Sequence, residues 1–204
     1  MMRNRATAAA IAGVVAVLIV GGCSAEPVVH SEMDGPMSLS MGNSGSISIR
    51  APRNLPTTHE WSGTFGTFIP CMTTDDGPAR VTGLEFADTT GPEPVSAVAY
   101  ARTFDPATDT PIGSMRGKAT DLDIGSTQLR EGTEGLDVSA TCSDDLGFEG
   151  PLTDEILISL TADERGAHVG DVTVTYLLAD GSEHAVRTSW DFYLCGSEAP
   201  EELC

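Results

Sequence analysis

The sequence has few cations, few aromatic residues and almost no lysine. Its 204 residues include 11 Lys or Arg against 30 Asp or Glu, and Lys118 is the only lysine. Binding to nucleic acid needs clustered cations that replace the phosphate counterions, so this composition excludes nucleic acid as a partner. The acidic residues are spread along the chain without a run of five like charges, which indicates a solvated, folded surface rather than an acidic tail.

The common catalytic motifs are also missing. The chain contains no G-x-S-x-G, S-x-x-K or H-E-x-x-H string, and the nearest match, residues 113–117, has its serine one place early. No histidine has a second metal ligand at helical or strand spacing, so we expect surface polar roles for His30, His59, His168 and His184. The sequence therefore predicts that the protein is not an enzyme and needs no cofactor.

Long hydrophobic runs are absent except near the N-terminus. The apolar run from Ala8 to Val20 has 13 residues and would span roughly 20 Å as a helix, against roughly 30 Å of bilayer hydrocarbon. It is too short for a transmembrane helix. Arg3 and Arg5 precede it and Val20-Gly-Gly-Cys23 follows it, which is the layout of a signal peptide over residues 1–22.

The end of this run resembles the lipobox of bacterial lipoproteins. The resemblance implies that Cys23 becomes the first residue of the mature chain and is modified by diacylglycerol, with palmitate among its acyl chains. It also implies a lipid anchor at the extracytoplasmic face of the cell membrane. Removal of Arg3 and Arg5 with the signal would take the net charge from −19 to −21. The high ratio of Arg to Lys is similar to that of lipoproteins from GC-rich bacteria.

Residues 23–45 hold Ser, Gly, Pro, Met and acidic residues with little apolar mass. Such a composition predicts a flexible tether that could reach on the order of 70 Å from the membrane. We expect the folded domain to begin at residue 46, to include residues 46–204, and to fold as a monomer without the tether.

A histidine and three methionines spaced by four lie in this tether. Thioethers and imidazole select Cu(I), and the pattern is similar to Met-rich stretches in some exported copper-handling proteins. The alternative is a short strand with one apolar face, because Met37, Leu39 and Met41 alternate with serines. The copper hypothesis assigns the ligands to His30, Met33, Met37 and Met41.

The remaining chain has the periodicity of β-strands. Gly and Pro together make up 34 residues and favour short strands joined by tight turns. Asp180-Gly181 is the strongest hairpin signal, and it predicts a two-residue type I′ turn. Leu157 lies inside an alternating run, which indicates burial on both faces. Strands are expected within 46–50, 61–71, 81–86, 95–104, 135–142, 154–162, 171–178 and 183–195.

This count predicts an all-β fold, an antiparallel β-sandwich of about seven or eight strands. The chain resembles the immunoglobulin-like domains common in exported bacterial lipoproteins, although it has no Cys-Trp-Cys spacing. That resemblance implies the fold only.

Residues 105–133 are the least regular part of the domain. They carry many Pro and Gly residues and the carboxylates Asp105, Asp109, Asp121 and Asp123. An excursion of this length is either a pair of short edge strands or a functional loop. The run from Asp121 to Gly125 resembles the opening of a calcium loop, but the EF-hand pattern needs Asp or Asn where Gly125 stands. Ca²⁺ binding by this loop stays an alternative.

Four cysteines in an oxidising compartment predict two disulfides. Cys71 and Cys142 share the apolar phase of their strands, whereas Cys195 is out of phase and should point outward. We therefore favour Cys71 with Cys142 and Cys195 with Cys204. The rival pairing joins Cys71 to Cys195 and Cys142 to Cys204.

Together these patterns predict a lipid-anchored binding or accessory module of the cell envelope, with a protein or glycan partner. The alternative is a carrier of a small ligand or metal, Cu(I) or Ca²⁺, through the Met-rich tether or the acidic loop.

Overall fold

The computed structural model describes residues 26–32, 34–42, 44–55, 59–87, 92–125, 128–142, 152–198 and 204. The signal segment, Cys23 and Met33 lie outside them. Within this part of the chain, the helical structure is one 3₁₀ turn, η1 (Ala119–Asp121). The strands are β1 (Val28–Ser31), β2 (Met37–Ser38), β3 (Ser44–Arg50), β4 (Trp61–Phe68), β5 (Cys71–Met72), β6 (Ala79–Ala87), β7 (Ser96–Phe104), β8 (Ser114–Arg116), β9 (Gln128–Glu131), β10 (Asp137–Val138), β11 (Thr153–Ala162), β12 (Ala167–Leu177) and β13 (Glu183–Cys195).

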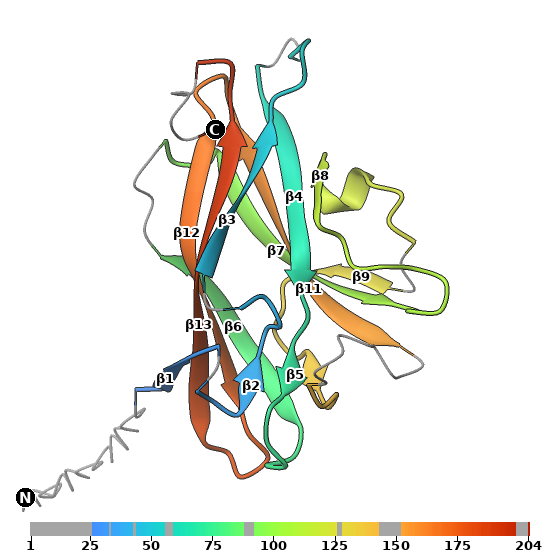
Figure 1. Cartoon of the computed structure of the whole chain (residues 1–204), viewed down its shortest axis with the longest axis vertical. Helices are drawn as coiled ribbons and strands as arrows, with labels where there is room; N and C mark the ends of the chain where they lie inside the picture. Colours follow the sequence, from blue (N-terminus) through green and yellow to red (C-terminus); the bar gives the residue numbers. More distant parts are fainter. Residues whose placement is uncertain are drawn as a thin grey trace, which may run out of the picture.

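Two sheets pack face to face (Figure 1). One has the order β1-β13-β12-β6-β10, with β3 also on β13, and the other has the order β8-β4-β11-β7-β9. Phe65 of β4 meets Phe192 of β13 with ring centroids 5.2 Å apart, so the core lies between the sheets. Gly63 allows the close approach, because a Cβ there would lie 2.6 Å from Leu194. The expected all-β sandwich is confirmed, and seven of the described strands have seven or more residues.

The last strand, β13, organises the larger sheet. It pairs antiparallel with β12 and parallel with both β1 and β3, which lie beside its first and last parts. These two parallel pairings depart from the antiparallel expectation. The hairpin before β13 forms where Asp180-Gly181 predicted it, but Leu178 and Ser182 close a three-residue connection with Gly181 at φ +84°.

The described part of residues 23–45 is not a flexible tether, and that expectation is wrong. β1 pairs with β13, and β2 pairs with β5. Met37 and Leu39 are fully buried in the main core. Leu39 donates its N–H to the Glu32 carboxylate (2.8 Å), and its carbonyl accepts from Ile69 (2.9 Å). The alternation of Met37 and Leu39 with serines is therefore that of a buried apolar face, and the folded domain begins before residue 46.

The excursion after β7 covers the outer face of the smaller sheet. It adds β8 to one edge beside β4, passes through η1, and returns as β9 at the other edge beside β7. Leu157 of β11 is fully buried on this outer face, while Ile156 and Ile158 face the main core. Burial of β11 on both faces is thus confirmed. A second apolar group, the outer cluster, consists of Tyr100, Ile112, Ala119, Ile124 and Leu157.

Two disulfides join Cys71 to Cys142 and Cys195 to Cys204, with Cα atoms 5.0 and 5.8 Å apart. The favoured pairing is confirmed. The expected outward direction of Cys195 is wrong, because this residue is 4% exposed. Its thiol pairs with the end of the chain while the side chain remains covered.

Candidate functional site

Two of the four histidines, His59 and His168, lie within 3.4 Å of a carboxylate oxygen. His168 is buried, bonds Asp191 at 2.8 Å and stacks on Tyr193 at 4.5 Å, so the expected surface role is wrong for this residue. His59 is mostly exposed, 3.4 Å from Glu164.

The other two histidines flank Tyr176. The hydroxyl of this buried tyrosine lies 2.5 Å from His30 Nε2, and its ring stacks on His184 at 5.7 Å. Burial raises the pKa of Tyr176, so its hydroxyl stays protonated. These contacts fix β1 and β13 to β12.

The copper hypothesis placed its ligands in a flexible tether. Met37 is fully buried with its Cα opposite that of Met72, and Met41 packs partly buried against the same core. His30 already bonds Tyr176, and Met33 lies outside the described residues. A position in a flexible tether is therefore wrong for Met37, and binding of copper to its thioether would require the main core to separate around it.

A cavity of about 660 Å³ opens between the end of β7 and the excursion that follows it. Arg102 of β7 lies at its floor, and Ile112 and Ile124 bring apolar surface from the outer cluster. Its polar lining comes from the excursion, which contributes Asp105, Thr108, Asp109, Thr110 and Asp123.

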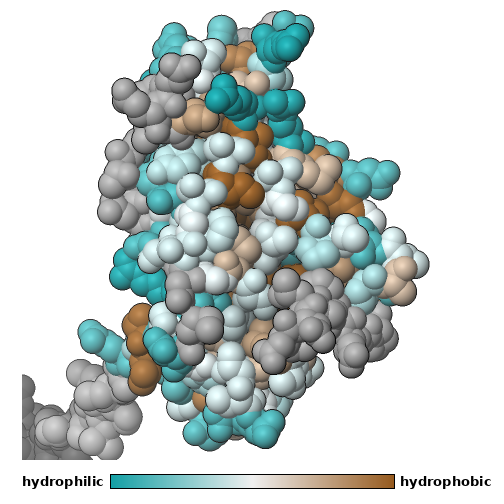
Figure 2. All heavy atoms as spheres, viewed as in Figure 1, coloured by the Kyte–Doolittle hydropathy of each residue, from teal (hydrophilic) through white to brown (hydrophobic). Residues whose placement is uncertain are grey.

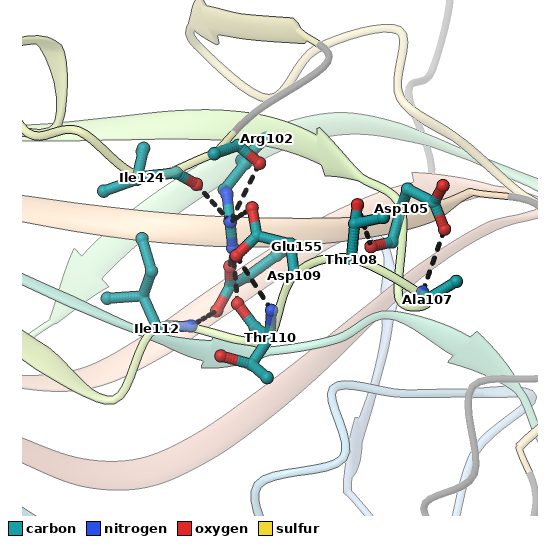
Figure 3. Close-up of polar contacts among 10 residues, drawn as sticks. Arg102, Asp105, Ala107, Thr108, Asp109, Thr110, Ile112, Ile124 and Glu155 are labelled. Carbon is teal, nitrogen blue, oxygen red and sulfur yellow. Dashed lines mark hydrogen bonds and ion pairs between the residues drawn. The ribbon is translucent and has the colours of Figure 1, made fainter.

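Arg102 is the centre of this site (Figure 3). Its side chain is 1% exposed, and one guanidinium nitrogen donates to Glu155 of β11 (2.8 Å) and to the Thr110 carbonyl (3.0 Å). The second terminal nitrogen donates to Asp109 (2.7 Å) and to the Ile124 carbonyl. Two separate parts of the excursion, residues 109–110 and residue 124, are therefore bonded to one cation, which fixes their position over the sheet.

Glu155 holds the other side of the pair. The residue is fully buried, and its second carboxylate oxygen accepts from the backbone N–H groups of Thr67 (2.7 Å) and Ile112 (2.8 Å). Burial raises the pKa of Glu155, while these bonds and Arg102 favour its charged form. Gly66 leaves space for the Glu155 carboxylate, because a Cβ at this position would lie 2.7 Å from it.

Local backbone strain accompanies this arrangement. Thr67, a β-branched residue, has φ +69°, and it lies where the pairing of β4 with β11 shifts register. Its N–H donates to Glu155, so the buried carboxylate helps to hold the strained position. Strain held in this way is a feature of sites under functional constraint.

The charges of the cavity do not balance. Asp109 and Glu155 share the guanidinium of Arg102, which is the sole cation among the described lining residues. Asp105 caps the N–H of Ala107, and the exposed Asp123 adds a further carboxylate. The cavity therefore offers two uncompensated carboxylates beside apolar surface, a combination that suits a cationic group carrying an aliphatic stem.

Metal binding finds no support in this arrangement. Within the described ranges, no group of three or more His, Cys, Asp or Glu side chains is placed to hold a metal ion. Asp121, which the calcium-loop resemblance included, is exposed and does not line the cavity. The acidic loop thus gives no support to the Ca²⁺ alternative.

The sequence pointed to this excursion as a candidate site but did not identify Arg102 and Glu155, the two residues at the centre of the site. Arg102 has the same alternation phase as Val98, Tyr100 and Phe104, and Glu155 shares the phase of Leu157. The available signal was a charged residue in phase with buried residues on each of two strands, which indicates a buried charge. It became informative only once β7 and β11 were known to pair, with Glu155 opposite Arg102.

No family model matches this chain, and no curated protein matches it. The chain is similar in shape to CfaE, the adhesive subunit of CFA/I fimbria of enterotoxigenic Escherichia coli, with TM-score 0.36 and 5% identity over 76% of this chain and 46% of that one. A mutant of the same adhesin gives TM-score 0.37 and 5% identity over 78% and 48%. The chain thus spans about half the length of these structures, and a likeness this distant carries no functional information.

Proposed function

We propose that this protein is a lipid-anchored, extracytoplasmic binding module of the cell envelope, and that the cavity over Arg102 receives a cationic side chain of a protein partner. The observation that carries the proposal is the buried Arg102–Glu155 pair, which fixes an acidic cavity of about 660 Å³ on the side of a β-sandwich.

A well-packed apolar pair of similar volume is often as stabilising as a buried ion pair, or more so, so stability alone does not account for Arg102 and Glu155. The pair instead fixes Thr110, Asp109 and Ile124 around the cavity mouth. A module whose task is recognition gains from such preorganisation.

The extracytoplasmic part of the proposal rests on different features. The segment from Val20 to Cys23 has the lipobox layout, and two disulfides join the described residues, as is usual in oxidising compartments. No helix within the described ranges is long and apolar enough to cross a bilayer.

Anchoring is tested by replacing Cys23 with Ala in the host bacterium. We expect the native chain in the membrane fraction with a diacylglycerol thioether on Cys23, and the variant as released or uncleaved protein. Mass spectrometry that finds an unmodified mature N-terminus elsewhere would contradict this part.

The binding site is tested with a matched pair of charge variants made in the unlipidated chain of residues 23–204 with Cys23→Ser. The probe is a short Lys/Arg-rich peptide, titrated calorimetrically at low and at physiological salt. We expect Asp123→Asn to weaken binding several-fold, because it removes a cavity carboxylate. Glu183→Gln removes an exposed charge on β13, outside the cavity lining, and should leave the affinity unchanged.

The control separates recognition from general attraction by net charge. If both variants lose the same small amount of affinity, and binding at physiological salt is absent, the peptide senses only the acidic surface. That outcome would refute the cavity as a site.

A further inference from the structure

The ordered domain begins close to the proposed lipid anchor. β1 starts at Val28, five residues after Cys23, so even a fully extended chain places their Cα atoms on the order of 18 Å apart. The composition had predicted a spacer of several times this reach. A lipid on Cys23 would therefore hold the β1 end of the sandwich near the bilayer surface.

β1 is bonded to the body of the domain, so its residues do not lengthen the spacer between Cys23 and the domain. All four of its residues pair in parallel register with residues 184–187 of β13. His30 bonds Tyr176, and its ring packs so closely on Gly35 that a Cβ there would lie 1.9 Å from the ring. Releasing β1 would break these contacts together.

The surface of β1 is apolar where it would meet the membrane. Val28 is 61% and Val29 59% exposed, and they are neighbours on the strand closest to Cys23. Figure 2 shows hydrophobic atoms where the N-terminal segment joins the body. Successive strand residues point to opposite faces, so the two valines lie on either side of β1, which is the first strand in the order of its sheet. Both side chains leave water if the edge of β1 enters lipid, since each buried aliphatic group stabilises the contact.

We propose that β1 is a membrane-contact strand, with Val28 and Val29 in the interfacial layer of the bilayer that holds the anchor. This inference rests on the lipid attachment proposed above. It gives the module a fixed orientation, with the β1 end toward the membrane. Figure 1 shows β8 and β9 projecting from the side away from β1, so the excursion that lines the cavity stays accessible to a partner.

The test uses the full lipidated chain in phosphatidylcholine vesicles with brominated acyl chains, which quench nearby tryptophan. Neutral lipid is chosen because anionic lipid would repel the carboxylates of Asp34 and Glu183, which lie beside β1. Val29→Trp places the probe on β1, at an exposed position outside the core. The matched control is Val95→Trp, because Val95 is 54% exposed. Its backbone N–H donates to Thr161, which pairs with the start of β4 at the end of the sandwich away from β1.

We expect the added emission of Val29→Trp to fall at least twofold relative to vesicles without bromine, and that of Val95→Trp to be unchanged. Equal emission changes for both probes would overturn the membrane-contact strand. Flotation of the wild-type chain with the vesicles is measured first. A chain that does not float refutes the anchor itself, whereas a chain that floats with an unquenched Trp at position 29 refutes only the contact.

Discussion

Leu39→Ala tests whether the N-terminal segment belongs to the core. Leu39 is fully buried, and the substitution removes three carbon atoms. At about 0.8 kcal/mol for each carbon, the lost transfer free energy is about 2.4 kcal/mol, and the remaining cavity brings the loss to about 3–4 kcal/mol. For a chain of this length we expect the thermal midpoint to fall by about 10 °C.

The assay is urea unfolding followed by tryptophan emission with both disulfides intact, since Trp61 is buried in the same core. Val29→Ala is the matched control, because Val29 lies in the same segment but is exposed, and its change should stay within about 0.5 kcal/mol. Midpoints that do not differ between the two variants would refute the buried position of Leu39.

Burial of the N-terminal segment also predicts the behaviour of a chain that begins at residue 46. Such a chain lacks β1, β2 and the two buried apolar side chains, Met37 and Leu39. Two losses of about 3–4 kcal/mol are comparable with the whole stability of a domain, about 5–15 kcal/mol. We now expect residues 46–204 alone to show no cooperative unfolding, in place of the independent folding that the composition suggested.

Three further predictions concern single side chains. Burial raises the pKa of Glu32, so its contribution to stability is present below the unfolded pKa and is lost as the pH rises through the folded pKa. The stability of wild type relative to Glu32→Gln should therefore improve from pH 7 to about pH 4.5, and a difference that does not vary with pH would contradict this. Arg102→Ala should lower the free energy of unfolding by about 3–5 kcal/mol, because Glu155 would remain buried without its cation. A urea midpoint equal to that of wild type would show that this pair is not buried. Cys204→Ser opens a bridge of sequence separation 9 and should destabilise the domain less than Cys71→Ser, which opens one of separation 71; calorimetry should rank them in this order.

The sequence predicted well those features that depend on local alternation. The phase of Cys71 and Cys142 predicted their disulfide, and the apolar Leu157 inside an alternating run predicted a strand buried on both faces. The Asp180-Gly181 pair marked the hairpin, although the connection has three residues. Each of these features is encoded within about ten residues, where period-two alternation specifies which side chains share a face.

The N-terminal segment shows where composition misled. Two of its apolar residues, Met37 and Leu39, are enough to join the core because the rest of that core is supplied by distant strands. Composition over a window measures how much a segment can bury by itself. It does not measure what the segment can cover in a structure made by the rest of the chain.

By itself, the sequence determined the β class and the presence of an irregular acidic excursion, and it favoured one of two disulfide pairings that the structure then confirmed. Only the tertiary structure decided that β1 and β3 lie parallel to β13, and that Arg102 meets Glu155 across a sequence separation of 53 residues. The physical reason is that alternation identifies the face a residue occupies but not the element that covers this face. Strand partners that are distant in the chain are selected by the packing of both sheets together, and the cavity exists only where that packing brings β7, β11 and the excursion into contact.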